Sequence, residues 1–433
     1  MIERDRHSTR PRCYNLALVS SPKTSRPRLP AFPQGRSISG APIPMLDLSR
    51  QYDQIRAELL AAVGRVCESQ HYILGPEVDA LEREAADFCG ARHAVGCASG
   101  TDALWLALVA AGVQPGDDVL TTPFSFFASS SAIVRAGARP VFADIDPLTF
   151  NLSPAATEEL LGTSNRKIRV ILPVHIYGQC VDMDAMDILT EKFGVAMVED
   201  AAQAIGAAWG EGGQSRRAGA MGAAAAFSFY PTKNLSAAGD AGLVTTNDEK
   251  LATHMKQLRN HGSPRRYVHE EFGWNSRLDA IQAAVLRVKL KYIEGWNQAR
   301  RQRAAIYARL FAESGLVGVK SAIGNQQSTI SVTQPIRLPH IAARAHHVFH
   351  QYVVRADRRD ELREFLTARG IGSEVYYPIP LHLQSCFAYL GHREGDFPES
   401  ERAAKEVLAL PMFPELTEDE QRRVVEAVAE FYQ

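Results

Sequence analysis

A lysine that follows a buried strand is the first residue whose position points to chemistry. Lys233 stands in the run FSFYPTKN at 227–234, where Pro231 ends the strand because proline cannot donate to a ladder. A lysine held there against apolar neighbours can lose its proton and attack an aldehyde as an amine. Most loop lysines are solvated surface residues, so Lys233 alone does not define a site.

A carboxylate and an amide follow a second apolar strand. Asp200 comes directly after the run Val195–Glu199, and Gln203 stands three residues further on. A carboxylate in that place could pair with a protonated ring nitrogen. It could equally cap the next helix, so both interpretations of Asp200 stay open at this point.

Two further strand ends could hold the rest of a flat, phosphorylated ligand. The run ASGTDAL at 98–104 puts Gly100 and Thr101 where a strand turns into a helix, and helix N-termini attract phosphate. Ser228 could add a hydroxyl to that phosphate. Phe126 follows the strand at 119–122 and could stack on a ring. The alternatives are an ordinary strand-to-helix turn and a core phenylalanine.

The combination carries more weight than its parts. In chain order the four strand ends supply a phosphate cup, a stacking ring, a carboxylate and a lysine. This set fits one planar cofactor that bears a phosphate and an aldehyde, pyridoxal 5′-phosphate, whose protonated ring is an electron sink. We therefore predict Lys233 and Asp200 as the catalytic residues, with Lys233 holding the cofactor as a Schiff base.

A sheet must bring these residues together. Helical stretches such as Asp102–Ala111 and Ala128–Ala136 separate several short apolar runs. Buried strands that alternate with helices predict an α/β fold, a three-layer sandwich with a mostly parallel seven-stranded sheet whose ligand site lies at the carboxyl ends of the strands. The predicted strands are Ala94–Ala98, Val119–Thr122, Pro140–Asp144, Val170–Val174, Val195–Glu199, Ala224–Phe229 and Gly242–Thr245.

The rest of the chain predicts a tail and a second domain. Residues 1–44 are rich in Arg, Ser and Pro, which is typical of disorder, and the apolar run at 16–19 is too short for a secretory signal. We predict a large cofactor-binding domain over 45–295. The helical stretch Leu278–Asn297 leads into a smaller C-terminal α+β domain over 296–433. Its predicted elements are a strand at His350–Arg355, a helix at Arg359–Arg369 and a helix from Glu418.

Composition excludes several classes of protein. The 433 residues carry a formal net charge of −1, which gives no general attraction to nucleic acid or to a membrane surface. No apolar run approaches the ~20 residues that span a bilayer. The six cysteines are scattered without metal-ligand spacing, which argues against a metal site or a disulfide framework and predicts a cytoplasmic protein.

The whole set of motifs resembles the DegT/StrS-type nucleotide-sugar aminotransferases, from about Met45 to the C-terminus. These enzymes have the aspartate-aminotransferase fold (type I) of PLP-dependent transferases. The motifs that carry the resemblance are ILGPEV (73–78), ASGTDAL (98–104), PVHIYGQ (173–179), EDAAQAIG (199–206), FSFYPTKNL (227–235), WNSRLDAIQAAVLRVKL (274–290), YYPIPLHLQ (376–384) and LPMFPELTEDE (410–420).

The resemblance assigns a role to each matching residue. It implies that Gln203 lies near the cofactor ring and that Asn275 reaches the phosphate from a neighbouring subunit, so that a homodimer is implied. It implies that Tyr376, Tyr377 and His382 belong to a motif near the sugar nucleotide. The remaining cofactor residues implied by the family are those already singled out above: Gly100, Thr101, Phe126, Asp200, Ser228 and Lys233.

The implied reaction moves an amino group from an amino acid, glutamate in the family, to a nucleotide-linked keto sugar. The motif FYPTKNL with RNHG at 259–262 and Tyr267 resembles members that aminate C3, so we expect a dTDP- or UDP-linked 3-keto hexose. Amination at C4 and a non-catalytic regulator of the same fold remain the alternatives. Related dehydratases carry His where this chain carries Lys233. One departure is Ala241, where many relatives have glycine.

Overall fold

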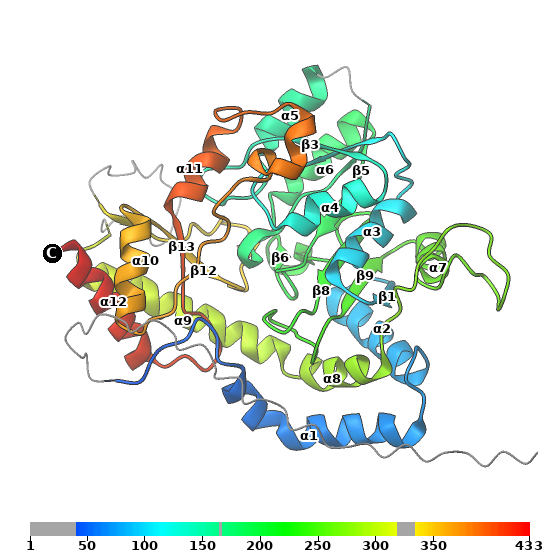
Figure 1. The fold of residues 1–433 in the computed structure, drawn as a ribbon, viewed down its shortest axis with the longest axis horizontal. Coiled ribbons are helices and arrows are strands. Elements are labelled where there is room, and N and C mark those ends of the chain that lie inside the picture. The colour runs from blue at the N-terminus through cyan, green and yellow to red at the C-terminus, as the bar shows by residue number, and fades with distance from the viewer. Residues whose placement is uncertain (1–39, 164–166, 318–333) are drawn as a thin grey trace, which may run out of the picture. The chain divides into compact units, whose positions relative to one another are not determined.

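The computed structural model describes residues 40–163, 167–317 and 334–433, all of which lie in one compact unit, Ser37–Gln433 (Figure 1). Most of the tail that was predicted to be disordered, residues 1–44, lies outside the described residues. Residues 40–44 are an exception and correct the predicted boundary at 44/45. Ile43 is buried, and its amide donates to the carbonyl of Gly370 at 2.8 Å, so the folded part begins before Met45.

A seven-stranded sheet forms the centre of the fold. The strand order is β1-β9-β8-β5-β4-β2-β3, and β9 alone runs antiparallel to its neighbours. Each of the seven predicted strands lies in this sheet, which confirms the predicted fold class. The strands are β1 (His93–Cys97), β2 (Asp118–Thr121), β3 (Arg139–Phe142), β4 (Ile168–Ile171), β5 (Ala196–Asp200), β8 (Ala224–Ser228) and β9 (Gly242–Thr246).

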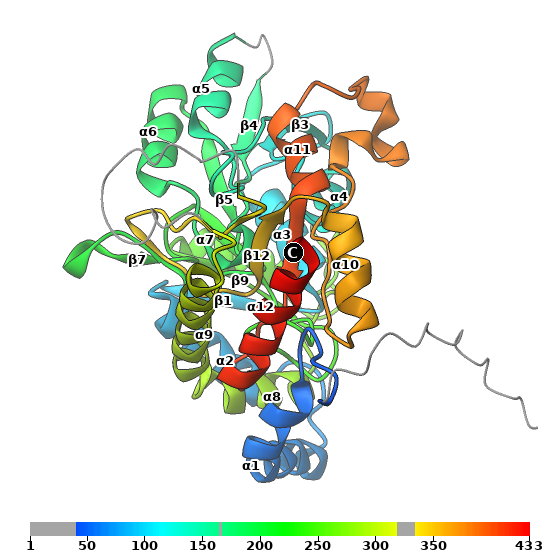
Figure 2. The same ribbon diagram turned by 90° about the vertical axis from the view of Figure 1, so that its left-hand side faces the viewer.

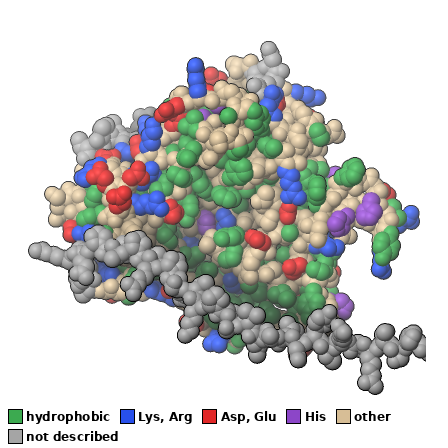
Figure 3. All heavy atoms as spheres, in the orientation of Figure 1, with side chains coloured by type: hydrophobic (Ala, Val, Ile, Leu, Met, Phe, Trp, Pro, Cys, Tyr) green, Lys and Arg blue, Asp and Glu red, His purple; other side chains and the backbone are tan. Residues whose placement is uncertain are grey.

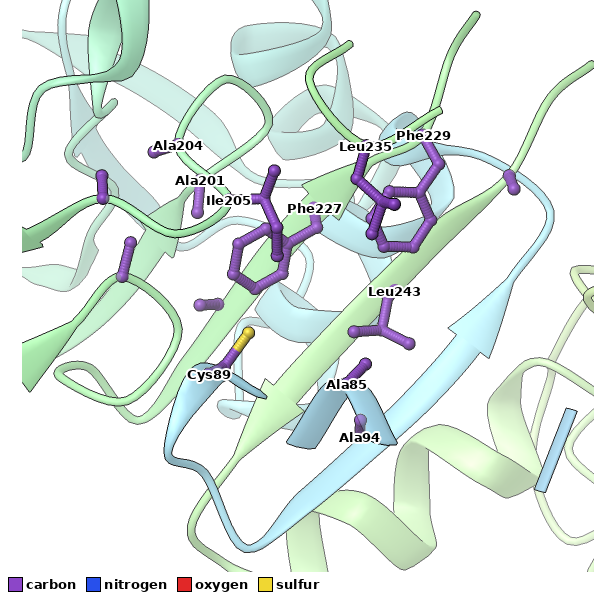
Figure 4. Packing of buried hydrophobic residues seen from close by; sticks show 14 of the residues in the cluster. Ala85, Cys89, Ala94, Ala201, Ala204, Ile205, Phe227, Phe229, Leu235 and Leu243 are labelled. Atoms are coloured by element: carbon purple, nitrogen blue, oxygen red, sulfur yellow. The ribbon is translucent and has the colours of Figure 1, made fainter. Parts of the chain in front are cut away.

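Helices cover both faces of the sheet because successive strand residues point to opposite sides. In β5, Met197 joins the core under α2, α6 and α8, whereas Val198 joins the core under α3, α4 and α7 (Figure 2). Figure 4 shows part of the first core, with Phe227 and Phe229 beside Leu235. These helices, with α1 and α5, are α1 (Leu48–Ser69), α2 (Pro76–Cys89), α3 (Gly100–Ala110), α4 (Phe127–Arg135), α5 (Pro154–Thr163), α6 (Met183–Phe193), α7 (Glu249–Leu258) and α8 (Ala280–Leu290).

A second apolar core gathers the C-terminal elements around the small sheet β10-β12-β13. A third small sheet has the order β11-β6-β7. The elements are β6 (Ala208–Trp209), β7 (Arg216–Arg217), β10 (Ile336–Arg337), β11 (Ala345–His346), β12 (Tyr352–Ala356), β13 (Val407–Leu410), α9 (Ile293–Glu313), α10 (Arg359–Ala368), α11 (Pro398–Glu406) and α12 (Glu418–Tyr432). Since both cores belong to one compact unit, the division at 295/296 stays a prediction.

The predicted helical stretch Leu278–Asn297 is interrupted. It forms α8 and the first turns of α9, which then continues to Glu313. The break at Lys291 and Tyr292 lets α8 bury its apolar face against α2, while most of the buried face of α9 packs in the second core. None of the helices among the described residues is both long and apolar enough to cross a bilayer.

Candidate active site

Two neighbouring parallel strands carry the predicted catalytic pair. Asp200 is the last residue of β5 and is paired with Ala226 of β8. Two residues later β8 ends at Ser228, and the chain turns into the loop that holds Lys233, whose amide donates to the carbonyl of Tyr230 at 2.8 Å. The carboxyl ends of the two strands therefore present Asp200 and Lys233 at the same edge of the sheet.

The charges of Lys233 and Asp200 influence each other. Burial lowers the pKa of Lys233 to about 8, and the charge of Asp200 opposes that decrease. Burial raises the pKa of Asp200, while hydrogen bonds and the charge of Lys233 oppose the increase. Among the described residues the two groups form no ion pair within 4.0 Å, so they interact across a gap rather than by contact.

Asp200 is also fixed by hydrogen bonds from another part of the chain. Its Oδ2 accepts a hydrogen bond of 2.7 Å from the hydroxyl of Ser129 in α4, and its Oδ1 accepts one of 3.2 Å from the amide of Ala202. The hydroxyls of Ser125 and Ser129 are 2.8 Å apart. These serines were not among the predicted site residues, although three consecutive serines at 129–131 in an otherwise apolar helix were a signal.

The predicted phosphate cup is closely packed. A Cβ atom on Gly100 would lie 2.5 Å from the Cβ of Ser228, and one on Gly242 would lie 2.2 Å from the carbonyl oxygen of Ser99. Ser99 caps α3 by accepting a hydrogen bond from the amide of Asp102 at 3.1 Å. The amides of Gly100 and Thr101 have no partner within the helix, and Gly100 packs against Ser228, an arrangement that suits an anion.

Aromatic and amide side chains lie around the same strand ends. Phe126 is 59% exposed, and its ring lies 6.1 Å from the ring of Tyr377. Gln203 donates from Nε2 to the Tyr377 hydroxyl at 3.1 Å and accepts from the amide of Tyr177 at 2.6 Å. The hydroxyl of Tyr177 in turn donates to the carbonyl of Tyr376. The structure thus brings Phe126, Gln203 and Tyr377 together near Asp200.

The loop after Lys233 is anchored by three consecutive buried residues. Asn234 donates from Nδ2 to Asn297 Oδ1 at 2.8 Å and to the carbonyl of Val348 at 3.2 Å. Leu235 packs in the first core, and the hydroxyl of Ser236 accepts a hydrogen bond from Lys289 at 2.9 Å. These contacts fix the chain on the C-terminal side of Lys233, and their long-range partners were not predicted from the sequence.

Two predicted site residues stand apart from this cluster. His382 is buried, and its Nε2 lies 3.0 Å from Glu401, so the structure gives it a partner in α11. Its predicted role toward the sugar stays a prediction. Asn275 is exposed and forms an isolated antiparallel β-bridge with Asn260 in the loop after α7. Its contact with a neighbouring subunit also stays a prediction.

Ala241 causes no backbone strain, although it was noted as a departure from the usual glycine. It is buried, its φ is not positive, and its carbonyl accepts a hydrogen bond from the amide of Phe229 at 2.9 Å. The extra methyl group therefore packs in the core without forcing a left-handed conformation.

Glu199 is a buried carboxylate on the opposite face of β5 from Asp200. It accepts hydrogen bonds from three amides, those of Gly219 at 3.0 Å, Met221 at 2.9 Å and Gly222 at 2.8 Å, and its Oε2 lies 3.0 Å from His175 Nε2. Burial acts to raise the pKa of Glu199, but the hydrogen bonds outweigh it and leave the pKa lowered. Alternation along the strand explains why adjacent acids serve different sites.

The fold and these residues define a class of protein: a type I PLP-dependent transferase. The residues fit the cofactor because a buried carboxylate, an amine of lowered pKa and a glycine cradle meet at one sheet edge. Residues 53–429 match the DegT/DnrJ/EryC1/StrS aminotransferase family, and the chain belongs to that family. It is therefore an aminotransferase, and its cofactor is pyridoxal phosphate.

Three similar relatives cover most of the chain. A pleiotropic regulatory protein of Geobacillus stearothermophilus is 48% identical, over 90% of this chain and 98% of its own length. A dTDP-3-amino-3,4,6-trideoxy-alpha-D-glucose transaminase of Streptomyces venezuelae is 43% identical, over 90% and 96%. A UDP-N-acetyl-3-dehydro-alpha-D-glucosamine 3-aminotransferase of Acidithiobacillus ferrooxidans is 40% identical, over 89% and 97%.

Solved structures agree with the fold. DesV of S. venezuelae, in complex with a ketimine intermediate, is 42% identical and superimposes with a TM-score of 0.83, over 91% of this chain and 99% of DesV. A Bacillus subtilis protein, ntda, with bound cofactor PMP is 27% identical with a TM-score of 0.78, over 92% and 88%.

Proposed function

We propose that this protein transfers an amino group from glutamate to C3 of a nucleotide-linked 3-keto hexose, carried by dTDP or UDP. The observation that carries the catalytic part is the buried Asp200 at one strand end facing the amine of Lys233 at the next. The sugar part is supported by relatives whose names specify 3-amino or 3-dehydro sugars.

Lys233 acts as the proton-transfer group. An amine can accept a proton only when it is neutral, and burial brings the pKa of Lys233 down to about 8, so a larger share of the amine is neutral at physiological pH. Lys233 would take a proton from the donor's α-carbon and, in the second half of the reaction, deliver one to the sugar carbon that receives nitrogen. Bound pyridoxal phosphate supplies the electron sink and carries the amino group between the two halves.

The other site residues bind and orient. Asp200 holds the ring nitrogen in its protonated form, and the amides of Gly100 and Thr101 with the Ser228 hydroxyl bind the phosphate. Phe126 would cover one face of the ring, and its neighbour Tyr377 accepts a hydrogen bond from Gln203. Tyr376 and Tyr377 lie next to this group and are our candidates for contact with the sugar nucleotide, as is His382 at lower priority because Glu401 already occupies its Nε2.

The substrate test is a panel of 3-keto and 4-keto nucleotide sugars incubated with the holoenzyme and glutamate. The proposal expects amino sugar and 2-oxoglutarate from the 3-keto compounds. If only the 4-keto compounds are aminated, the site of amination is C4, the alternative position, and the assignment to C3 is wrong. Replacing glutamate by other amino acids identifies the donor in the same assay.

A homodimer with shared active sites is part of the proposal. The loop after α7 exposes large aromatic side chains, Phe272 at 96%, Tyr267 at 80% and Trp274 at 53%. Figure 3 shows hydrophobic, basic and histidine side chains together on the projecting loop at the right. A large exposed apolar group of this kind is typical of an interface. Asn275 follows Trp274 directly, which supports a role for it in the partner's site.

A non-catalytic regulator is the alternative that the family assignment disfavours, although the relative at 48% identity is named as a pleiotropic regulatory protein and another at 40% as a sensory transduction protein. A regulator has no need of a complete set of Lys233, Asp200, Gln203 and Ser228. The two candidates differ in the absorption spectrum. An aminotransferase shows a visible cofactor band that glutamate bleaches, whereas a regulator without activity leaves the band unchanged.

A further inference from the structure

Asp200 receives a hydrogen bond from a serine that neither the sequence motifs nor the proposed reaction uses. Ser129 lies in the first turns of α4, is 1% exposed, and donates to Asp200 Oδ2 at 2.7 Å. The donor is not in doubt, since an ionised carboxylate can only accept. The Ser129 oxygen is then free to accept from the Ser125 hydroxyl, which lies 2.8 Å away and is itself buried.

Burial makes this hydrogen bond important. Burying an ionised carboxylate away from water costs free energy unless hydrogen bonds replace the lost hydration. The side-chain oxygens of Asp200 receive two hydrogen bonds from the described residues, one from the amide of Ala202 at 3.2 Å and the shorter one from Ser129. Ser129 is therefore the main group that compensates for the burial of the charge, and Ser125 orients its hydroxyl.

We propose that Ser129 is a positioning residue that keeps Asp200 ionised and aimed at the cofactor's ring nitrogen, with Ser125 fixing the direction of the Ser129 hydroxyl. This proposal rests on the proposed function in one respect, namely that the cofactor's ring nitrogen is the partner of Asp200. When Asp200 is ionised, the proton that the two groups share stays on the ring nitrogen. The protonated ring is the form that draws electrons from the substrate carbon. Without the serine hydroxyl, the proton moves toward the carboxylate and the ring becomes a weaker electron sink.

The same helix provides a matched control. Ser130 is the next residue, is 0% exposed, and its hydroxyl has no hydrogen-bond partner among the described residues. Ser129→Ala and Ser130→Ala thus remove the same atom from equally buried places on one helix, and they differ in the contacts of the Ser129 hydroxyl with Asp200 and Ser125. Any change caused by the loss of a buried hydroxyl as such is common to both variants.

The test compares both variants with the wild-type holoenzyme loaded with pyridoxal phosphate labelled with ¹⁵N in the ring. For Ser129→Ala we expect the ring ¹⁵N resonance to move toward the unprotonated value, weaker cofactor binding in equilibrium dialysis, and kcat lower by about 10- to 100-fold at little-changed KM, the range for a hydrogen bond to a charged group. Ser125→Ala is expected to give a smaller change of the same sign. Ser130→Ala is expected to match the wild type.

Equal effects of Ser129→Ala and Ser130→Ala, or a normal ¹⁵N resonance and normal kcat in Ser129→Ala, would overturn the proposal. This failure is separate from failure of the proposed function. If the wild type itself binds no cofactor and aminates no keto sugar, the function is wrong. If the wild type is active and Ser129→Ala behaves like it, only the role of Ser129 is wrong.

Discussion

At the scale of single residues, the proposed proton transfer depends on the proton affinity of the Lys233 amine. Burial lowers the pKa of the Lys233 amine to about 8, and the negative charge of Asp200 partly restores it. The cofactor-free protein should therefore contain a lysine that becomes nucleophilic at a pH well below that of an ordinary lysine, for which the pKa is about 10.4.

We predict that Lys233 of the cofactor-free protein reacts with trinitrobenzenesulfonate with a pH midpoint near 8. Asp200→Asn removes the nearby negative charge that favours the protonated amine, so the midpoint moves to lower pH in that variant. Peptide mapping by mass spectrometry assigns the modified lysine at each pH. A midpoint that rises in Asp200→Asn contradicts the proposed electrostatic pairing.

At the scale of elements, the lysine loop is held by α9 as much as by its own backbone. Asn297 of α9 accepts from Asn234 at 2.8 Å and donates from Nδ2 to the carbonyl of Ile205 at 2.9 Å. It thereby joins the loop after β8, which carries Lys233, to the loop that follows Asp200 at the end of β5. His350 lies on the other side of Asn234, with Nδ1 3.1 Å from Asn234 Oδ1.

Asn297→Ala should cost about 1–3 kcal/mol in the free energy of unfolding, because the Ile205 carbonyl loses the hydrogen bond from Asn297 and the Asn234 amide loses one of its two acceptors. Gln298→Ala, at the exposed neighbouring position of α9, should stay within about 0.5 kcal/mol of the wild type. Urea denaturation measures both. We also expect lower turnover in Asn297→Ala under conditions where the variant remains folded. An Asn297→Ala protein as stable and as active as Gln298→Ala would show that the hydrogen bonds do not support the loop.

Gly100→Ala tests the contact between α3 and β8. The added methyl group would lie 2.5 Å from the Cβ of Ser228, so the helix start and the strand end must separate. We expect weaker binding of pyridoxal phosphate, measured by equilibrium dialysis. Gly295→Ala is the control, since a Cβ there meets nothing within 4 Å and alanine favours the helix. Unchanged cofactor affinity in Gly100→Ala would argue against the phosphate cup.

Local pattern predicted the elements but not all their partners. The seven apolar runs all became strands of the central sheet, since burial on both faces leaves a clear record in sequence. The antiparallel insertion of β9 between β1 and β8 left no such record, because strand order depends on long-range pairing. The break between α8 and α9 was also missed, as it reflects packing against two cores.

The residues of the candidate site also fall into those that local sequence predicted and those that it did not. Strand-end positions identified Lys233, Asp200, Gly100 and Ser228, because parallel strands bring their carboxyl ends to one edge. Ser129 and Asn297 were missed because their contacts with Asp200 and Asn234 span 71 and 63 positions along the chain. No local pattern encodes such a separation.

At the scale of the whole molecule, the proposal places one residue of each site on the neighbouring subunit. A subunit with Lys233→Ala keeps Asn275, and a subunit with Asn275→Ala keeps Lys233. In a mixed dimer, one site then contains both residues and the other contains neither. Random mixing makes half of the dimers mixed, so activity should recover to about a quarter of the wild-type value.

The mixing experiment uses the two variants unfolded and refolded together, with each variant refolded alone as the control. Sedimentation reports the oligomeric state in parallel. Recovery above the sum of the two separate variants supports shared sites. Activity that merely equals that sum in dimers shown to be mixed contradicts the role of Asn275 across the interface.

Reductive trapping shows which lysine holds the cofactor. Borohydride added to the protein with pyridoxal phosphate fixes the cofactor to the amine that holds it, and mass spectrometry of the peptides locates the pyridoxyl group. We predict that the pyridoxyl group lies on Lys233. Lys289 is the informative competitor, because burial also lowers its pKa to about 8 and it lies beside Ser236. A pyridoxyl group on Lys289, or on no specific lysine, would contradict the account.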